Sequence, residues 1–143
     1  MPLDVERETV AGEPDGLILF DGVCVFCSAW VRFILKHDRA GRFVFLPIQT
    51  ERGRALAERL GIDADRPRTN AVLMDGQAWV RSDAALKVLE ALPSTRVLGV
   101  LRAVPRILRD PVYDLIAANR YRLFGHTTTC MAPSPGDRAR FLL

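Results

Sequence analysis

A pair of cysteines between an apolar strand and an amphipathic helix constrains this chain more than any other feature. The short apolar run 17–20 has the length and residue types of a buried strand, and a turn at Asp21 follows it. Cys24 and Cys27 come next, at the start of a segment whose apolar residues recur at helical spacing as far as His37. The order strand, turn, CxxC, helix therefore predicts that both thiols lie in the first turn of a helix.

The expected position of Cys24 indicates what chemistry such a pair can perform. The unpaired N–H groups and the positive dipole end of a helix favour the thiolate, which is the attacking species in thiol–disulfide exchange. We therefore predict that Cys24 is the nucleophile and that Cys27 is the resolving thiol, which attacks the mixed disulfide and releases the reduced substrate. A structural disulfide and half of a zinc site remain open as alternatives. The strand–helix context favours the redox interpretation.

A wider likeness accompanies the cysteine pair. The run 21–27, DGVCVFC, resembles the DxxCxxC signature of the DCC family of predicted thiol–disulfide oxidoreductases, small proteins related to thioredoxin. The segments 75–76, 82–85 and 119–121 and Cys130 also look like that family, so the resemblance covers about residues 16–133. It implies a thioredoxin-like fold and dithiol chemistry, and it names a type of reaction rather than a substrate.

The spacing of apolar residues and turn residues predicts the fold class. The expected strands cover residues 17–20, 43–48, 70–74 and 77–81. Helices are expected after Cys24, after Thr50 and after Ser82, and the last two of these residues can cap a helix. The order β-α-β-α-β-β-α matches the core of thioredoxin. The sequence therefore predicts an α/β fold with a thioredoxin-like core.

A helical C-terminal extension is expected beyond this core. Apolar residues between 97 and 108 recur at helical spacing, and this helix is expected to end near Pro105. Asp110 and Pro111 then predict a new helix, with a cap residue followed by proline at the first helical position. The expected apolar face of this last helix comprises Val112, Leu115, Ile116, Ala118 and Tyr121.

Length and composition limit the remaining possibilities. A chain of 143 residues is long enough for one domain with a core that needs no disulfide. We expect a flexible leader at 1–15, a thioredoxin-like domain at 16–133 that includes helices within 95–124, and a tail at 134–143. No apolar run reaches the length of about 18 residues that a transmembrane segment needs. The acidic, polar N-terminus is the reverse of a signal peptide, which indicates a cytoplasmic location.

Positive charge is concentrated in the C-terminal third of the chain. Residues 94–143 contain eight arginines and three aspartates. This distribution predicts either a solvated basic face or a docking face for an acidic partner or an anionic membrane surface, with Arg102, Arg106 and Arg109 as candidates. Nucleic acid is not expected as a partner, because no aromatic stacking platform or reading motif accompanies the charge. A non-catalytic interaction module built on this basic face is therefore one alternative function.

Asp21, Thr69 and Asn70 are candidate neighbours of the dithiol. Asp21 could carry a proton to or from Cys27, or it could simply form the turn by accepting bonds from nearby N–H groups. Thioredoxin-like proteins usually have a cis-proline directly before the third strand, facing the dithiol. Here Thr69 or Asn70 is expected at that position instead.

Cys130 is the third cysteine, and its role is open. It could be a second resolving thiol, or it could pack against the active site. Together with Cys24, Cys27 and His126 it could also form a Cys₃His zinc set, which would make this a structural zinc protein. The favoured interpretation needs no cofactor. The partners expected for it are a disulfide-bearing protein or a small thiol, and a cellular reductant.

Overall fold

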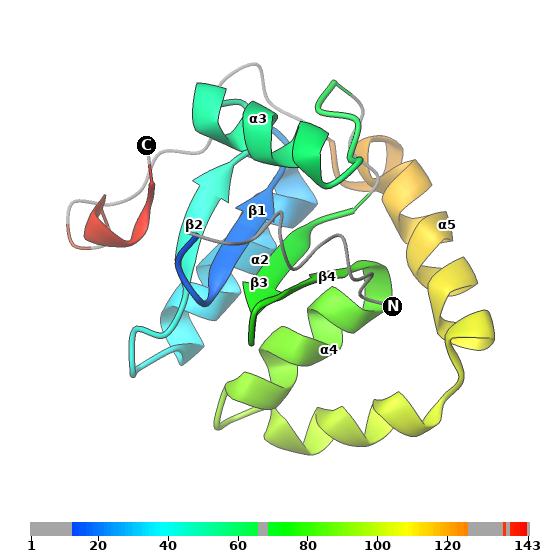
Figure 1. Cartoon of the computed structure of the whole chain (residues 1–143). Coiled ribbons are helices and arrows are strands. Elements are labelled where there is room, and N and C mark those ends of the chain that lie inside the picture. Colours follow the sequence, from blue (N-terminus) through cyan, green and yellow to red (C-terminus); the bar gives the residue numbers. More distant parts are fainter. Residues whose placement is uncertain (1–12, 66–68, 126–135, 137, 143) are drawn as a thin grey trace.

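The computed structural model describes residues 13–65, 69–125, 136 and 138–142. A four-stranded sheet forms its centre, with the strand order β2-β1-β3-β4 (Figure 1). The parallel pair β1 and β2 lies at one side, and β3 runs antiparallel to both β1 and β4. The strands are β1 (Leu17–Phe20), β2 (Val44–Pro47), β3 (Ala71–Met74) and β4 (Gln77–Val80).

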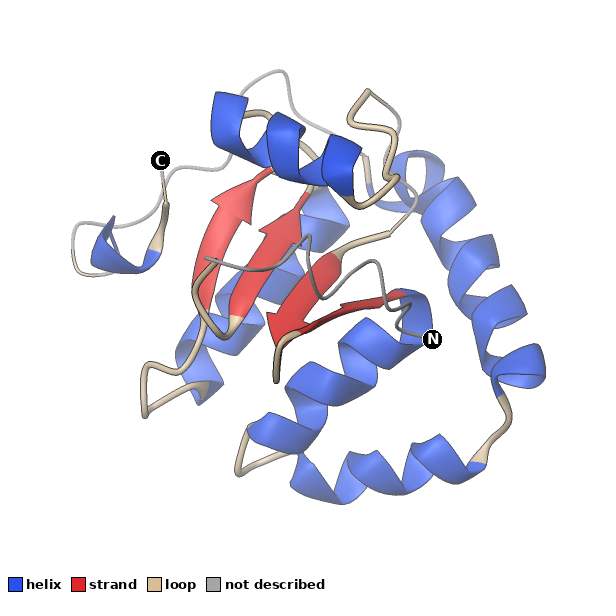
Figure 2. Cartoon of the chain, viewed as in Figure 1, coloured by secondary structure: helices blue, strands red, loops and turns tan. Residues whose placement is uncertain are grey.

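Alternate residues of the strands feed two separate cores, one on each face of the sheet. Ile18 and Phe20 of β1 pack under α2 (Val25–His37) and α4 (Arg81–Ala91), whereas Leu17 and Leu19 pack under α3 (Glu51–Arg59) on the other face. Figure 2 shows these three layers, with helices on both sides of the strands. The described fold is thus compatible with a thioredoxin-like core, and the predicted α/β fold class is confirmed.

Residues near the C-terminus join the first of these cores. A short 3₁₀ helix, η2 (Arg138–Arg140), leads to Phe141, which is 6% exposed and forms a parallel bridge with Phe45. Arg140 forms an ion pair with Asp38, whose carboxylate also accepts from the N–H groups of Arg42 and Phe43. The expected tail therefore contains residues that pack on the sheet.

Two expected helix starts are wrong. The helix α4 begins at Arg81 with Val80 as its N-cap, and no side chain caps it. Ser82 is not the cap; its hydroxyl donates to Asp110 and accepts from Nη1 of Arg109. Asp110 and Pro111 do not start a new helix either, because α5 (Arg106–Phe124) begins directly after Pro105 and contains Pro111. Each residue has the chemistry of a helix start, but tertiary contacts use it differently.

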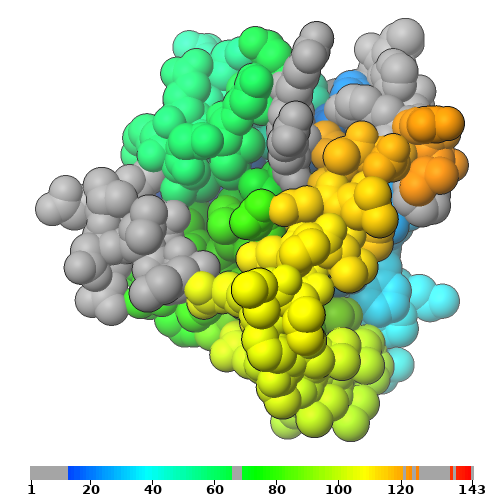
Figure 3. All heavy atoms as spheres, turned by 90° about the vertical axis from the view of Figure 1, so that its right-hand side faces the viewer, coloured from blue at the N-terminus to red at the C-terminus, as the bar shows by residue number. Residues whose placement is uncertain are grey.

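The segment after α4 forms what we call the C-terminal arm, which comprises the 3₁₀ helix η1 (Arg96–Ala103) and α5. The arm runs along the edge of the molecule and then beside the sheet domain (Figures 1 and 3). Its apolar residues are mostly uncovered: Val97 is 77% exposed, Ile107 is 80% exposed and Leu115 is 67% exposed. In contrast, Arg120 of α5 is buried. Of the expected apolar face of the last helix, Val112, Leu115 and Ala118 are exposed, Ile116 borders a pocket, and the side chain of Tyr121 lies outside the described residues. Polar side chains of the helix contact the domain.

None of the helices in the described part of the chain combines the length and apolar character that crossing a membrane would require.

Candidate dithiol site

Cys24 occupies the N-cap of α2, at the carboxyl end of β1. Its extended backbone (φ −81°, ψ 123°) suits a cap residue, and its Sγ accepts from the N–H of Cys27 at 3.3 Å. The turn before it is closed by the Cys24 N–H, which donates to the carbonyl of Asp21 at 3.2 Å. A thiol thus takes the place of the serine or aspartate oxygen that usually caps a helix. This geometry agrees with the predicted position of the pair in the first turn.

The two thiols differ in acidity because they share a hydrogen bond. Donation from the Cys27 thiol lowers the pKa of Cys24 to about 6, helped by the Cys27 N–H and the charge of Arg120, although burial alone would raise it. The same bond, together with burial and the Cys24 charge, raises the pKa of Cys27. At neutral pH the pair therefore holds one proton, on Cys27, and the negative charge lies on Cys24.

Both cysteines are free thiols and both are buried. Cys27 is 4% exposed and borders a pocket, whereas Cys24 has no exposed surface. The end of α5 lies against the start of α2 here, since the carbonyl of Gly125 accepts from the N–H of Val25 at 3.3 Å. Cys24 is consequently activated but covered in this conformation.

Asp21 lies beneath the dithiol and joins it to the C-terminal arm. Its Oδ1 accepts from the N–H of Val23 at 3.2 Å and from Nε2 of Gln49 at 2.7 Å. Its Oδ2 accepts from Nη2 of Arg120 at 3.2 Å, and the two side chains are 1% and 8% exposed. Asp21 therefore forms the turn, as one of the two interpretations predicted, and it also binds a buried cation from α5.

Sequence reasoning missed the partners of Asp21. Arg120 is 99 positions away along the chain, and Gln49 follows a strand with no local signal of a role in the site. The sequence did offer one sign, because Arg120 belongs to the segment 119–121 of the family resemblance and could anchor the last helix either to the core or to the CxxC side. It did not identify Asp21 as the partner.

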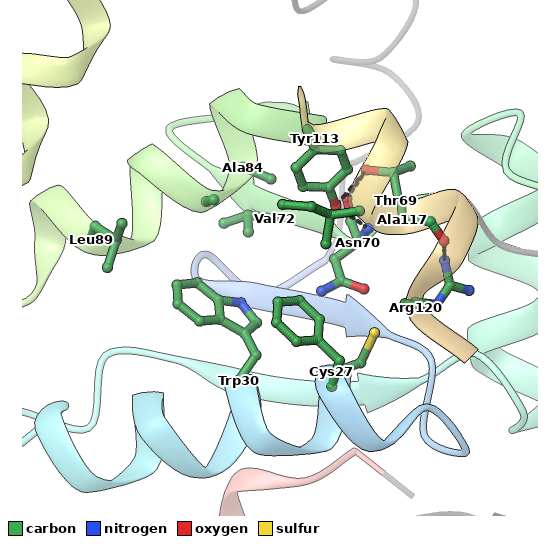
Figure 4. A pocket seen from close by; sticks show the side chains of 13 residues that line it. Cys27, Trp30, Thr69, Asn70, Val72, Ala84, Leu89, Tyr113, Ala117 and Arg120 are labelled. Atoms are coloured by element: carbon green, nitrogen blue, oxygen red, sulfur yellow. Dashed lines mark hydrogen bonds between the residues drawn. The ribbon is translucent and has the colours of Figure 1, made fainter. Parts of the chain in front are cut away.

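A pocket of about 190 Å³ opens beside Cys27, between α2, α4 and α5 (Figure 4). Thr69 and Asn70 both line it, so the structure brings these predicted neighbours into the same cavity as Cys27. Tyr113 of α5 fixes this corner, because its hydroxyl accepts from the N–H of Asn70 at 3.3 Å and lies 3.4 Å from Oγ1 of Thr69. Burial raises the pKa of Tyr113, so its hydroxyl stays protonated at neutral pH.

Two members of the alternative zinc set cannot be placed. His126 and Cys130 lie outside the described residues. The expected role of Cys130 as an auxiliary thiol therefore stays a prediction. Within the ranges that the structure describes, no group of three or more His, Cys, Asp or Glu side chains is arranged to hold a metal ion.

The arginines of the expected basic face make contacts within the chain. Arg102 forms an ion pair with Glu90 of α4. Arg106 and Arg109 both pair with Asp83 of the same helix, at 2.7 Å and 3.1 Å. These three side chains therefore attach the C-terminal arm to α4 in this structure.

Comparisons with known proteins point to one family. A family profile described as DCC1-like thiol-disulfide oxidoreductase matches residues 18–126. A Bacillus subtilis protein named YuxK, described as uncharacterized, is 42% identical over 130 residues, which are 90% of this chain and 95% of that protein. An Arabidopsis thaliana DCC family protein, described as chloroplastic, is 33% identical over 116 residues, which are 80% of this chain and 67% of that protein. No solved structure matches the chain.

Proposed function

The chain belongs to the DCC1-like thiol-disulfide oxidoreductase family, and on that premise we propose that it exchanges a dithiol for a disulfide at Cys24 and Cys27. One observation carries the proposal: Sγ of Cys24 caps α2 and has a pKa lowered to about 6 by its bond with Cys27. A thiolate at neutral pH beside a protonated thiol is what the two steps of exchange require.

The proposed reaction assigns a separate role to each sulfur. The Cys24 thiolate attacks one sulfur of the substrate disulfide, forms a mixed disulfide and releases the other half as a thiolate. Cys27 then attacks Sγ of Cys24, its proton passes to the departing sulfur, and the second half leaves as a thiol. The protein ends with a Cys24–Cys27 disulfide and has passed two electrons to the substrate. A cellular dithiol reductant restores the reduced pair.

The covered position of Cys24 adds a requirement. With no exposed surface at Cys24, the substrate sulfur must approach from the side of Cys27, or the end of α5 must separate from α2. Opening at this end of α5 would break the Gly125–Val25 hydrogen bond and the nearby contact between Arg120 and Asp21, while the strands of the sheet domain stay paired.

Asp21 is proposed as a proton carrier for Cys27. Its buried carboxylate lies near both thiols, where its charge raises their pKa values. Substitution Asp21→Asn keeps the shape of the side chain and removes the charge. If this variant folds normally and reduces disulfides at the full rate, Asp21 carries no proton in the reaction.

The proposed partners are a disulfide-bearing protein or small molecule and a cellular reductant. The proposed location is the cytoplasm, where the thiol pool keeps cysteine pairs reduced between turnovers.

Three serine variants of the cysteines test the proposal. Cys24→Ser should abolish disulfide reduction, because it removes the thiol whose pKa is lowered to about 6. Cys27→Ser should accumulate a mixed disulfide on Cys24, detectable by mass spectrometry of protein isolated under acid quench. Cys130→Ser is the matched third substitution, and slower turnover in it would assign a resolving role to Cys130. Equal, partial losses in the Cys24 and Cys27 variants would overturn the separate roles.

A further inference from the structure

The pocket beside Cys27 has a mostly apolar lining. Most of the residues around it are aromatic or aliphatic, and Figure 4 shows Trp30 and Leu89 at one end of the cavity and Cys27 and Arg120 at the other. An apolar cavity of roughly 150 Å³ is large enough for benzene, and this one measures about 190 Å³. The apolar lining residues are Phe26, Trp30, Val72, Ala84, Ala85, Leu89, Ile116 and Ala117.

Several polar groups of the pocket already have partners within the protein. The Tyr113 hydroxyl accepts from the N–H of Asn70, and Oγ1 of Thr69 accepts from the N–H of Arg81 at 2.7 Å. Arg120 binds Asp21 and the carbonyl of Ala117. A charged group that entered the cavity would exchange its hydration for a lining that is mostly apolar, whereas an apolar group would lose contact with water only.

We propose that this pocket binds the apolar arm of a small-molecule disulfide, an uncharged aromatic or branched aliphatic group about the size of a phenyl ring. The proposal rests on the proposed function, since it names the substrate class of the same dithiol. Side chains of three helices border the cavity, and its volume of about 190 Å³ suits one such group. The arm would lie between Trp30 and Ala117, and its sulfur would emerge at the Cys27 end.

Two substrates that differ in their apolar arm can measure the contribution of the pocket to disulfide reduction. In 2-phenylethyl 2-hydroxyethyl disulfide, the Cys24 thiolate attacks the sulfur that bears the phenylethyl arm and releases 2-hydroxyethanethiolate. Cys27 then attacks Cys24, which releases 2-phenylethanethiol and leaves the protein disulfide. Bis(2-hydroxyethyl) disulfide undergoes the same two-electron reduction without an apolar arm. The ratio of the two single-turnover rate constants therefore isolates the contribution of the pocket.

Two neighbouring alanines of α5 supply matched variants. Ala117 lines the pocket, whereas Ala118 is exposed on the outer side of the same helix. We expect the wild type to prefer the phenylethyl disulfide by about 10-fold or more, which corresponds to partial burial of one ring. Ala117→Phe should reduce this ratio to near one by filling the cavity, and Ala118→Phe should leave it unchanged. A wild-type ratio near one, or a full preference in Ala117→Phe, would overturn the proposal.

A binding measurement separates failure of the pocket from failure of the chemistry. The chain has two tryptophans, and in a Trp79→Phe background Trp30 alone reports on the cavity. Titration with 2-phenylethanol, which cannot react with thiols, should change the Trp30 emission with saturation, and Ala117→Phe should abolish the change. If no disulfide is reduced but this titration saturates, the proposed function fails and the pocket stands. If disulfides are reduced without saturation, the pocket proposal fails.

Ala85→Leu provides a second cavity-filling variant in case Ala117→Phe does not fold. It fills the same cavity from α4 instead of α5, and thermal unfolding of both variants identifies any loss of structure. Loss of the preference in a folded Ala85→Leu variant would support the proposal, and its retention would contradict it.

Discussion

The sheet domain and the C-terminal arm use the same kinds of residues in opposite ways. In α2, Val31 and Ile34 have no exposed surface, and the apolar side of the helix faces the sheet. In α5, Leu115 is 67% exposed, whereas Arg120 of the same helix is 7% exposed. Burial of apolar side chains holds the sheet domain together. The arm is held largely by charged and hydroxyl groups that find partners on the domain.

This difference matters for the chemistry, because the arm, which is attached by polar contacts, supplies two residues of the dithiol site. Arg120 lowers the pKa values of both cysteines, and Tyr113 fixes the corner of the pocket at Asn70. Both side chains come from α5. The electrostatic setting of a dithiol carried by the sheet domain thus depends on a region attached by polar contacts.

Substitution of Arg120 should have the largest effect. Arg120→Met leaves the buried carboxylate of Asp21 without its cation, and loss of one partner of a buried ion pair costs about 3–5 kcal/mol. It should also raise the pKa of Cys24 above about 6, because a favourable charge is lost. Urea unfolding measures the first effect, and the pH dependence of iodoacetamide labelling measures the second.

Arg122 of the same helix provides the control for this substitution. Its side chain is exposed, so Arg122→Met should change the free energy of unfolding by no more than about 0.5 kcal/mol. It should not change the pH dependence of iodoacetamide labelling. If the Arg120 and Arg122 variants behave alike, the ion pair does not attach the arm, and the contrast between the two regions is smaller than the structure indicates.

A pair of leucines tests the contrast directly. Leu19 of β1 has no exposed surface, so Leu19→Ala should cost about 2–5 kcal/mol of unfolding free energy by leaving a cavity. Leu115→Ala makes the same chemical change on the exposed side of α5 and should cost at most about 0.5 kcal/mol. Denaturant titration of both variants gives the comparison. A cost for Leu115→Ala close to that for Leu19→Ala would mean that the outer side of the arm is covered in solution.

The same contrast explains how far the sequence could predict the structure. The strands and the CxxC helix were predictable because short apolar runs, turn residues and helical spacing are local signals. For α5, spacing gave a helix but the wrong inward side, since its orientation depends on partners such as Asp21 that are distant in the chain. Ser82 and Asp110 have the chemistry of helix caps, but they bond to each other instead.

The candidate site was predictable in part for the same reason. Cys24 and Cys27 belong to one local motif, and the structure places them as a capped, hydrogen-bonded pair. Gln49 follows β2, whereas Tyr113 and Arg120 both lie on α5, and the packing of α5 against the sheet domain brings these two to the motif. The contact between Gly125 and Val25, beside Cys24, has the same origin, since it depends on where the end of α5 lies.

The stability of the reduced protein should rise with pH from about 6 to about 9. In this range Cys24 is deprotonated in the folded state but protonated in the unfolded state, so the unfolded state binds more protons. The gain is at most about 1.4 kcal/mol per pH unit, and it disappears as the pH falls through about 6. Above about 9 the raised pKa of Cys27 reverses the trend. Cys24→Ser should lack the rise when both proteins are unfolded in urea at several pH values, and a parallel rise in Cys24→Ser would assign it to other groups.

Removal of the Tyr113 hydroxyl should have the smallest of these effects. Tyr113→Phe keeps the ring in the pocket wall and removes the acceptor of the Asn70 N–H, which typically costs about 1 kcal/mol. The Asn70 amide should then exchange its hydrogen faster, while amides within the centre of the sheet keep their protection, because the lost bond belongs to the arm. Hydrogen exchange followed by NMR distinguishes the two regions residue by residue. If Tyr113→Phe leaves the Asn70 amide as protected as before, then apolar contacts of Ile116 and Ala117 hold the arm in place, and polar attachment is not what separates the arm from the sheet domain.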